Sequence, residues 1–177
     1  QNDIVLGGDG NDTVAAGSGA DSVGGGFGED QLSGGDDGDS IRGGNNDDQL
    51  LGQGGNDQLF GEHGQDTLWG GAGADQLTDA EGANFLLGEA GNDTLSGNGT
   101  LYGGDDNDVL SLASGSYGLG EAGNDSLYGD VGAETLSGGL GTDYLAAGDG
   151  ADSLSGGDLA DSLLGGGGND TLLGGDD

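Results

Sequence analysis

The chain has 177 residues, 48 of them glycine, and it contains no proline, cysteine or methionine. Its 34 carboxylates stand against one basic side chain, Arg42, so the formal net charge is −33. Such an acidic chain repels nucleic acid and anionic membranes and attracts cations. A disulfide scaffold is excluded, and no apolar run approaches the roughly 20 residues that a membrane-spanning helix needs.

The first regular block, residues 1–96, is built from units of nine residues. Ten consecutive units run from Gly7 to Ser96 without a slip, preceded by the partial unit Gln1–Leu6. When the places of a unit are numbered one to nine, glycine is frequent at places one, two and four. Asp stands at place six and an aliphatic residue at place eight. A disordered acidic tail has no need of such a period, so the pattern favours a folded repeat.

The irregular segment at residues 79–119, called the seam below, interrupts this period. In its first unit Asp79 and Ala80 replace the leading glycines and Asn84 replaces the place-six Asp. We expect that turn to bind a cation weakly or not at all. The unit 97–102 is three residues short, and 112–119 has neither the Asp nor a clear core residue. Two interpretations stay open, a defect tolerated in a long solenoid and a contact site.

A second regular block occupies residues 120–177 and holds six full units from Gly120 to Leu173. Glu134 at place six is a milder departure from the pattern. We expect residues 1–177 to form a single domain. Because the chain starts without Met and stops within a repeat, we expect a processed product or a segment of something longer.

Each unit is predicted to be a turn followed by a short strand. Glycine at places one, two and four allows positive φ, which predicts a turn over places one to six. Side chains alternate along a strand, so place eight points into the core while places seven and nine face solvent.

The consensus G-G-x-G-x-D-x-U-x resembles the repeat of the RTX (repeats-in-toxin) calcium-binding family, and the resemblance covers almost the whole chain. It implies an all-β fold, a parallel β-roll (right-handed β-solenoid) of about nine to ten coils with two nonapeptides per coil. Ten coils at about 4.8 Å each give a prism roughly 45 to 50 Å long.

The resemblance also implies that the place-six Asp residues are Ca²⁺ ligands shared between adjacent turns of one edge. The predicted metal ligands are Asp3, Asp12, Asp21, Asp30, Asp39, Asp48, Asp57, Asp66, Asp75, Asp93, Asp108, Asp125, Asp143, Asp152, Asp161 and Asp170. Spacing by 18 places Asp12 and Asp30 on one edge, and Asp21 and Asp39 on the other.

Calcium is expected to be required for folding. Ca²⁺ takes six to eight oxygens, which Asp carboxylates and the backbone carbonyls of stacked turns can supply. Roughly ten to sixteen ions would offset most of the acidic charge. Apolar burial alone does not offset the conformational entropy of so glycine-rich a chain, so the metal-free chain should be unfolded. The place-three carboxylates either add ligands or keep the surface soluble.

Catalysis is not expected, and no other metal motif is present. A nucleophilic serine needs a positioned base, and the one histidine, His63, falls in a turn. Without lysine there is no P-loop, and without cysteine or a second histidine there is no zinc site. No twelve-residue loop ending in a bidentate Glu fits an EF-hand.

One row of apolar side chains is a candidate partner contact. Leu51, Trp69 and Leu87 are 18 residues apart at the outward-facing place nine, and Phe85 faces outward beside Leu87. A ladder of this kind on a polar face is typical of a docking surface. It could equally be covered by a flanking segment.

Two functions remain open, and the sequence favours the first over the alternative. The first is a secreted extracellular or cell-surface element whose copies stack end to end into a fibre or surface layer, since Gly174–Asp177 supplies the front of a unit and Gln1–Leu6 the back. The second is implied by the resemblance. It is a calcium-triggered secretion and folding module of a larger type I-secreted bacterial toxin, protease, lipase or adhesin.

Overall fold

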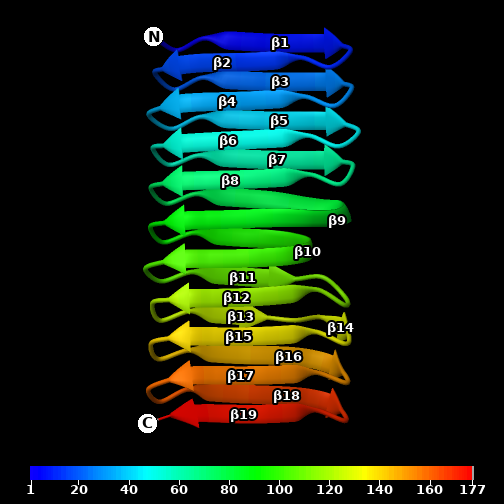
Figure 1. The fold of residues 1–177 in the computed structure, drawn as a ribbon, viewed down its shortest axis with the longest axis vertical. Helices are drawn as coiled ribbons and strands as arrows, with labels where there is room; N and C mark the ends of the chain where they lie inside the picture. The colour runs from blue at the N-terminus through cyan, green and yellow to red at the C-terminus, as the bar shows by residue number, and fades with distance from the viewer. Residues whose placement is uncertain (177) are drawn as a thin grey trace.

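The computed structural model describes residues 1–176, which form strands and turns with no helix among them. The chain winds into a parallel β-solenoid of about ten turns, with two facing rows of strands joined along two edges (Figure 1). In the regular coils each residue pairs with the residue 18 positions later, as Val5 pairs with Val23. The predicted all-β roll with two nonapeptides per coil is confirmed.

One row consists of β1 (Ile4–Asp9), β3 (Ser22–Phe27), β5 (Ser40–Asn45), β7 (Gln58–His63), β11 (Val109–Leu112), β13 (Ser126–Tyr128), β16 (Tyr144–Gly150) and β18 (Ser162–Gly168). The facing row consists of β2 (Thr13–Ser18), β4 (Gln31–Asp36), β6 (Gln49–Gly54), β8 (Thr67–Ala72), β12 (Tyr117–Ala122), β15 (Thr135–Leu140), β17 (Ser153–Asp158) and β19 (Thr171–Asp176). Two longer strands, β9 (Gln76–Ala90) and β10 (Thr94–Asp105), bend across an edge and join both rows. The short β14 (Val131–Gly132) pairs with β16.

The strands are longer than predicted. A regular strand covers places seven to nine of one unit and places one to three of the next, as β2 does. The prediction of a turn over places one to six was therefore wrong for places one to three. Positive φ recurs at places two and four even without glycine, as at Gln53 (φ 80°) and Leu159 (φ 75°), so place two is a bend within a paired strand.

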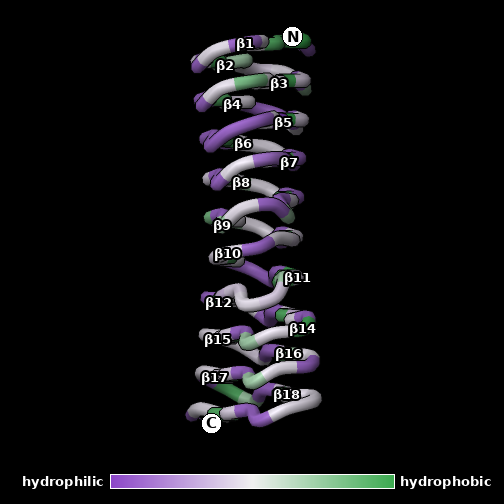
Figure 2. The backbone as a smooth tube through the Cα atoms, turned by 90° about the vertical axis from the view of Figure 1, so that its right-hand side faces the viewer, coloured by the Kyte–Doolittle hydropathy of each residue, from purple (hydrophilic) through white to green (hydrophobic). Residues whose placement is uncertain are grey.

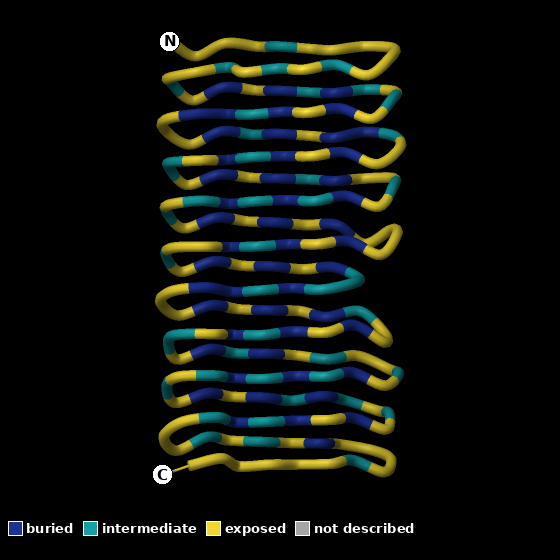
Figure 3. Tube along the Cα trace, in the orientation of Figure 1, coloured by how far each residue is buried: buried dark blue, intermediate teal, exposed yellow. Residues whose placement is uncertain are grey.

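The core is a double ladder of place-eight side chains, and Figure 3 shows its buried segments recurring in every inner coil. These side chains are essentially inaccessible from Leu32 to Leu154, whereas Leu172 in the last coil is 46% exposed. The place-seven and place-nine side chains alternate outward, which fits the prediction. No helix within residues 1–176 is long and apolar enough to cross a membrane.

The seam does not break the core. At the place-eight position of the unit 112–119 stands Gly118, and the buried side chain of Leu112 fills the space beside it. The expectation that this unit lacks a core residue was wrong, because Leu112 at place one contributes the missing side chain. The register contracts here, so that Leu87 pairs with Tyr102, 15 residues later.

The two edges differ. The edge on the left of Figure 1, called the continuous edge, carries Asp at place six in every turn. The edge on the right, called the interrupted edge, carries Asp12, Asp30, Asp48 and Asp66, then Asn84, the shortened turn at Asn98–Gly99, Ser116, Glu134, Asp152 and Asp170. Figure 2 faces the interrupted edge, where hydrophilic and near-neutral residues predominate in the turns.

Candidate metal sites

Each place-six Asp precedes a strand and ties its turn to the turn one coil before it. One carboxylate oxygen, Oδ1, accepts a hydrogen bond from the backbone N–H of the preceding Asp on the same edge. Along the continuous edge nine such bonds run from Asp3 to Asp161, with N···O distances of 2.7–2.8 Å. The ladder holds every Asp in one orientation, because both the donor and the acceptor repeat with the coil.

The second carboxylate oxygen is left without a partner. Sixteen buried carboxylate oxygens accept no hydrogen bond within residues 1–176, those of Asp12, Asp21, Asp30, Asp39, Asp48, Asp57, Asp66, Asp75, Asp79, Asp93, Asp108, Asp125, Glu134, Asp143, Asp152 and Asp161. A buried anionic oxygen without a donor is strongly unfavourable unless a cation neutralises it.

Fourteen of the sixteen predicted ligands belong to this set. The other two, Asp3 and Asp170, lie in the first and last coils, each of which stacks on a neighbouring coil on one side only. Metal ligation by the predicted residues stays a prediction, but their arrangement is uniform.

A backbone carbonyl lies close to ten of the unpartnered oxygens. At ten place-one glycines, the position that a Cβ would occupy is bordered by Oδ2 of the Asp in the same unit and by the carbonyl oxygen of the place-one residue one coil on. At Gly43, for example, these are Asp48 Oδ2 and the Gly61 carbonyl. Place one is therefore glycine for lack of space and not, as predicted, because it needs positive φ. A side chain there would fill the place where the two oxygens meet.

Burial makes these carboxylates hard to ionise. It raises the pKa of Asp93 to about 7 and that of Asp108 to about 8, partly offset by the backbone N–H that each accepts and reinforced by neighbouring carboxylates. The same causes raise the pKa of Asp48 to about 7 and that of Asp57 to about 6. A bound cation would reverse this balance by favouring the charged form.

The donor set fits Ca²⁺. Within residues 1–176 no three His, Cys, Asp or Glu side chains gather in one place, so backbone carbonyls would have to complete any coordination sphere. Mixed carboxylate and carbonyl oxygens are the ligands that Ca²⁺ prefers. A bound ion would supply positive charge between coils, and the place-six Asp would orient it through Oδ2 while Oδ1 keeps the hydrogen bond to the preceding turn.

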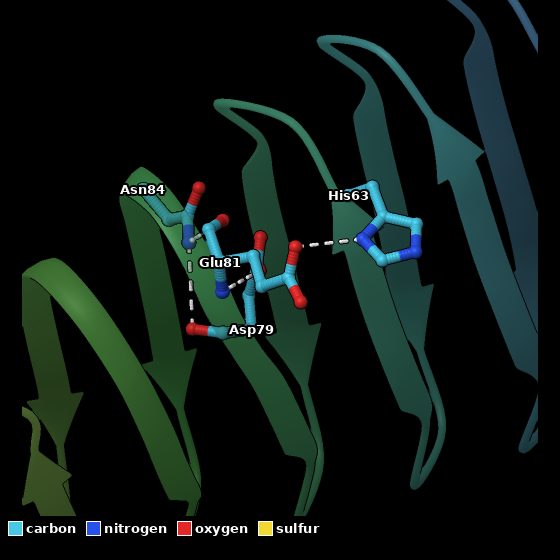
Figure 4. Close-up of polar contacts among 4 residues, drawn as sticks. All are labelled: His63, Asp79, Glu81 and Asn84. Atoms are coloured by element: carbon cyan, nitrogen blue, oxygen red, sulfur yellow. Dashed lines mark hydrogen bonds and ion pairs between the residues drawn. The ribbon is translucent and has the colours of Figure 1, made fainter.

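Asn84 gives its turn a different chemistry (Figure 4). Its Oδ1 accepts the Asp66 N–H at 2.9 Å, as an Asp would. Its Nδ2 donates to the Glu81 carbonyl at 2.9 Å and to the Asp79 carbonyl at 3.4 Å. The amide group thus donates to two backbone carbonyls of its own turn, which a carboxylate cannot do. This geometry supports the expectation of weak or absent calcium binding at this turn.

The next two turns of the interrupted edge also lack a carboxylate. Ser116 Oγ accepts the Gly99 N–H at 3.0 Å and donates to Asn98 Oδ1 at 3.1 Å. Glu134 restores the carboxylate after them, since its Oε1 accepts the Gly115 N–H at 2.7 Å and its Oε2 is buried without a partner.

Sequence reasoning missed two residues of the set, Asp79 and Glu134. Glu134 was seen as a departure at place six, and its acidic side chain at that place was the available signal. Asp79 lies at place one, where the period predicts glycine, so the only available signal was an acidic residue in the place of that glycine.

The apolar row of Leu51, Trp69 and Leu87 is present and is longer than predicted. These residues pair in register across β6, β8 and β9, and the row continues to Tyr102. Phe85 is 38% exposed and its ring lies 5.2 Å from that of Tyr102. A partner for this row stays a prediction.

A solenoid whose edges carry repeated, buried and unpartnered carboxylate oxygens beside backbone carbonyls belongs to the class of calcium-binding β-rolls. The RTX calcium-binding nonapeptide repeat matches in overlapping stretches that together span the chain, at residues 1–32, 24–59, 33–68, 42–77, 69–100, 96–119, 117–145 and 146–177. The chain belongs to this family, whose repeats bind calcium and are non-catalytic. No curated protein matches the chain.

Proposed function

We propose that the chain is a secreted, non-catalytic module that is unfolded at low calcium and folds into the roll when Ca²⁺ fills its edges outside the cell. The observation that carries this proposal is the set of sixteen buried carboxylate oxygens without a hydrogen-bond donor. With one arginine and one histidine, the chain itself cannot neutralise them. Their mutual repulsion would open the coils, and divalent cations from solution would close them.

The family supports an extracellular setting, because RTX repeats are typical of secreted bacterial proteins. Such a setting offers millimolar calcium, whereas the cytosol keeps calcium low. A module that folds only after export would pass a secretion channel as an extended chain. A type I exporter and a larger toxin, protease, lipase or adhesin are the context that the family resemblance implies.

Circular dichroism tests this proposal directly. The sheet signal should appear on titration with Ca²⁺, disappear in excess chelator and return when calcium is restored. Mg²⁺ at the same concentration is the matched control, and it should fold the chain poorly, because Mg²⁺ demands near-ideal octahedral geometry and dehydrates reluctantly. A compact sheet signal in chelator at neutral pH would refute the proposal.

End-to-end association is a second candidate function, and one observation favours it. The outer strands β1 and β19 each pair with a strand on one side only. Apolar side chains are exposed on both, with Ile4 at 80% and Leu173 at 64%. Where no further coil covers them, strand edges of this kind pair readily with a second copy. In calcium, electron micrographs should show filaments if copies stack, and Leu173→Lys should shorten them. Isolated rods would leave the folding module as the function.

A further inference from the structure

Asp79 is the one acidic residue of the chain that lies at a buried place-one position. It stands in β9, one coil after Gly61, and its side chain is 1% exposed. In regular turns place one is glycine, because a carboxylate oxygen and a carbonyl crowd it. Here the chain instead directs a second carboxylate toward the neighbouring site.

The carboxylates of Asp66 and Asp79 converge on one position. A Cβ added to Gly61 would overlap Oδ2 of both residues, whereas at the ten regular sites it meets a single carboxylate and a carbonyl. Asp66 is also 1% exposed. Its Oδ1 accepts the Asp48 N–H at 2.8 Å, and Asp79 Oδ1 accepts the Glu81 N–H at 3.3 Å. Both Oδ2 atoms remain without a donor.

No basic side chain neutralises this pair. His63 Nδ1 lies 2.7 Å from Glu81 Oε2, and Arg42 lies 3.1 Å from Glu62. Figure 4 shows the His63 ring in contact with the Glu81 carboxylate and not with that of Asp79, and both side chains of the pair are exposed. Burial, reinforced by the charge of the nearby Asp66 carboxylate, raises the pKa of Asp79 to about 8.

Asn84 explains why the pair would share one ion. The turn after Asp79 has its carbonyls occupied by the Asn84 amide, so no cation is needed there. The carboxylate that this turn lacks at place six is present at place one, directed to the preceding turn. The unit that carries Asn84 thus still holds one buried carboxylate, and two carboxylates of the edge are concentrated at a single position.

We propose that Asp66 and Asp79 form a two-carboxylate cation site that binds Ca²⁺ more tightly than the single-carboxylate sites of the roll. Trivalent lanthanides should bind at this site more tightly still. The proposal rests on the proposed function, because it presumes that the regular turns bind calcium. Affinity in calcium sites rises with the number of charged ligands, so we expect this site to fill at about tenfold lower cation concentration than the others.

Terbium luminescence tests the proposal on the full chain. Trp69 is the only tryptophan and follows Asp66 by three residues, within roughly 10 Å, so Tb³⁺ bound there should emit when tryptophan alone is excited. The chain is folded in calcium and titrated with Tb³⁺. In the wild type, Trp-sensitised emission should saturate near the first equivalent. Asp79→Gly restores the family glycine and leaves only the Asp66 carboxylate at this position. In this variant the Trp-sensitised emission should rise only in proportion to total Tb³⁺.

Two further variants sharpen the result. Asp79→Asn should lose early filling as well, because the amide can donate to Asp66 Oδ2 as Asn84 does in its own turn. Glu29→Gln removes the same charge from an exposed turn position and should keep the wild-type profile. Early saturation in Asp79→Gly would overturn the proposal. So would a wild-type signal that lags behind Asp79→Gly, since the carboxylates would then share a proton and exclude the metal.

Failure of the inference can be told apart from failure of the proposed function. If calcium does not induce the sheet signal in either the wild type or Asp79→Gly, calcium-dependent folding is wrong. If both chains fold with calcium but fill with Tb³⁺ identically, only the two-carboxylate site is wrong.

Discussion

The two edges of the roll share one core but differ in the side-chain groups that accept the backbone N–H of the preceding turn. On the continuous edge every turn from Asp3 to Asp161 repeats one hydrogen bond and, from Asp21 onward, one buried unpartnered oxygen. On the interrupted edge an amide at Asn84 and a hydroxyl at Ser116 take over the hydrogen bond without adding a charge. The comparison teaches that the structural role of place six, which is to accept a backbone N–H, is separable from its proposed metal-binding role.

This separation accounts for the position of the seam. The core ladder continues through it, with Leu86, Leu95, Leu101 and Leu110 fully buried. Each coil contacts mainly its neighbours in a solenoid, so a defect on one edge is held in place by the regular edge opposite. The contraction of the register by three residues is likewise absorbed within β9 and β10.

The largest effect is expected from removing an acceptor in the middle of the continuous edge. Asp93→Ala leaves the Asp75 N–H buried without a partner, which should lower the free energy of unfolding in saturating calcium by about 1 to 3 kcal/mol, in addition to the loss of an ion. Asp93→Asn keeps the acceptor and should lose only the ion. Urea unfolding measures the loss of stability from the missing acceptor, and the calcium stoichiometry measures the loss of the ion. Equal destabilisation in both variants would show that the two roles are not separable.

The next effect is pH dependence, which should arise at the buried carboxylates of both edges and be weakest at the turns where Asn84 and Ser116 replace them. Burial raises the pKa values of Asp93 and Asp108 in the metal-free fold to about 7 and 8, above the unfolded value of 3.8. Protons therefore stabilise the metal-free fold at low pH, and this stabilisation is lost as pH rises through those values. At these pH values the carboxylates are ionised both in the unfolded chain and in the Ca²⁺-bound fold, so the calcium midpoint for folding should change little between pH 8 and 6 and rise only as pH falls toward 3.8. The sheet signal in excess chelator should instead grow as pH falls from 8 to 6, which circular dichroism measures.

Hydrogen exchange resolves this pH effect by edge. The protection of the Asp75 N–H, which is bonded to Asp93, should depend on pH and calcium. That of the Asp66 N–H, which is bonded to the uncharged Asn84, should depend on them less. Identical dependence at both amides would contradict the assignment of different chemistry to the two edges.

A smaller effect is expected from converting the interrupted edge toward the continuous one. Asn84→Asp removes the donors to the Asp79 and Glu81 carbonyls and adds a buried charge near Asp79, so the calcium requirement for folding should rise. In saturating calcium the variant should bind one more ion, which calorimetry can count. Asn11→Asp adds the same charge to an exposed turn of this edge and should leave both quantities near wild type.

The smallest effect is expected on the outside of the seam. The His63–Glu81 pair is short, at 2.7 Å, but its side chains are 63% and 65% exposed. Such exposed pairs contribute little. His63→Gln should leave the calcium midpoint for folding unchanged by circular dichroism, because both side chains of the pair lie in solvent. A clear rise in the midpoint would indicate that the surface pair, and not Asn84 alone, holds the turn.

Much of the fold could be predicted because residue types of defined chemistry recur at fixed places of the nine-residue unit. An aliphatic residue at place eight, such as Leu59, predicts a core strand, and an Asp two places earlier predicts where the turn ends. Strand length could not be predicted this way, since glycine at places one to three has no side chain whose alternation would reveal a strand. Leu112 escaped prediction for a related reason, because it fills the core from place one only when Gly118 lies beside it.

The sequence by itself determined the repeat, the two edges, the core ladder and the acidic residues that await a cation, because each of these follows from a local pattern repeated every nine residues. Only the tertiary structure decided which oxygen of each carboxylate is used and that Asp79 meets Asp66. Those outcomes depend on the stacking of residues from successive coils, where a shift of a few residues in register changes which groups face each other. The physical reason is that burial and hydrogen bonding between coils, absent from any single unit, set the electrostatics of the edges.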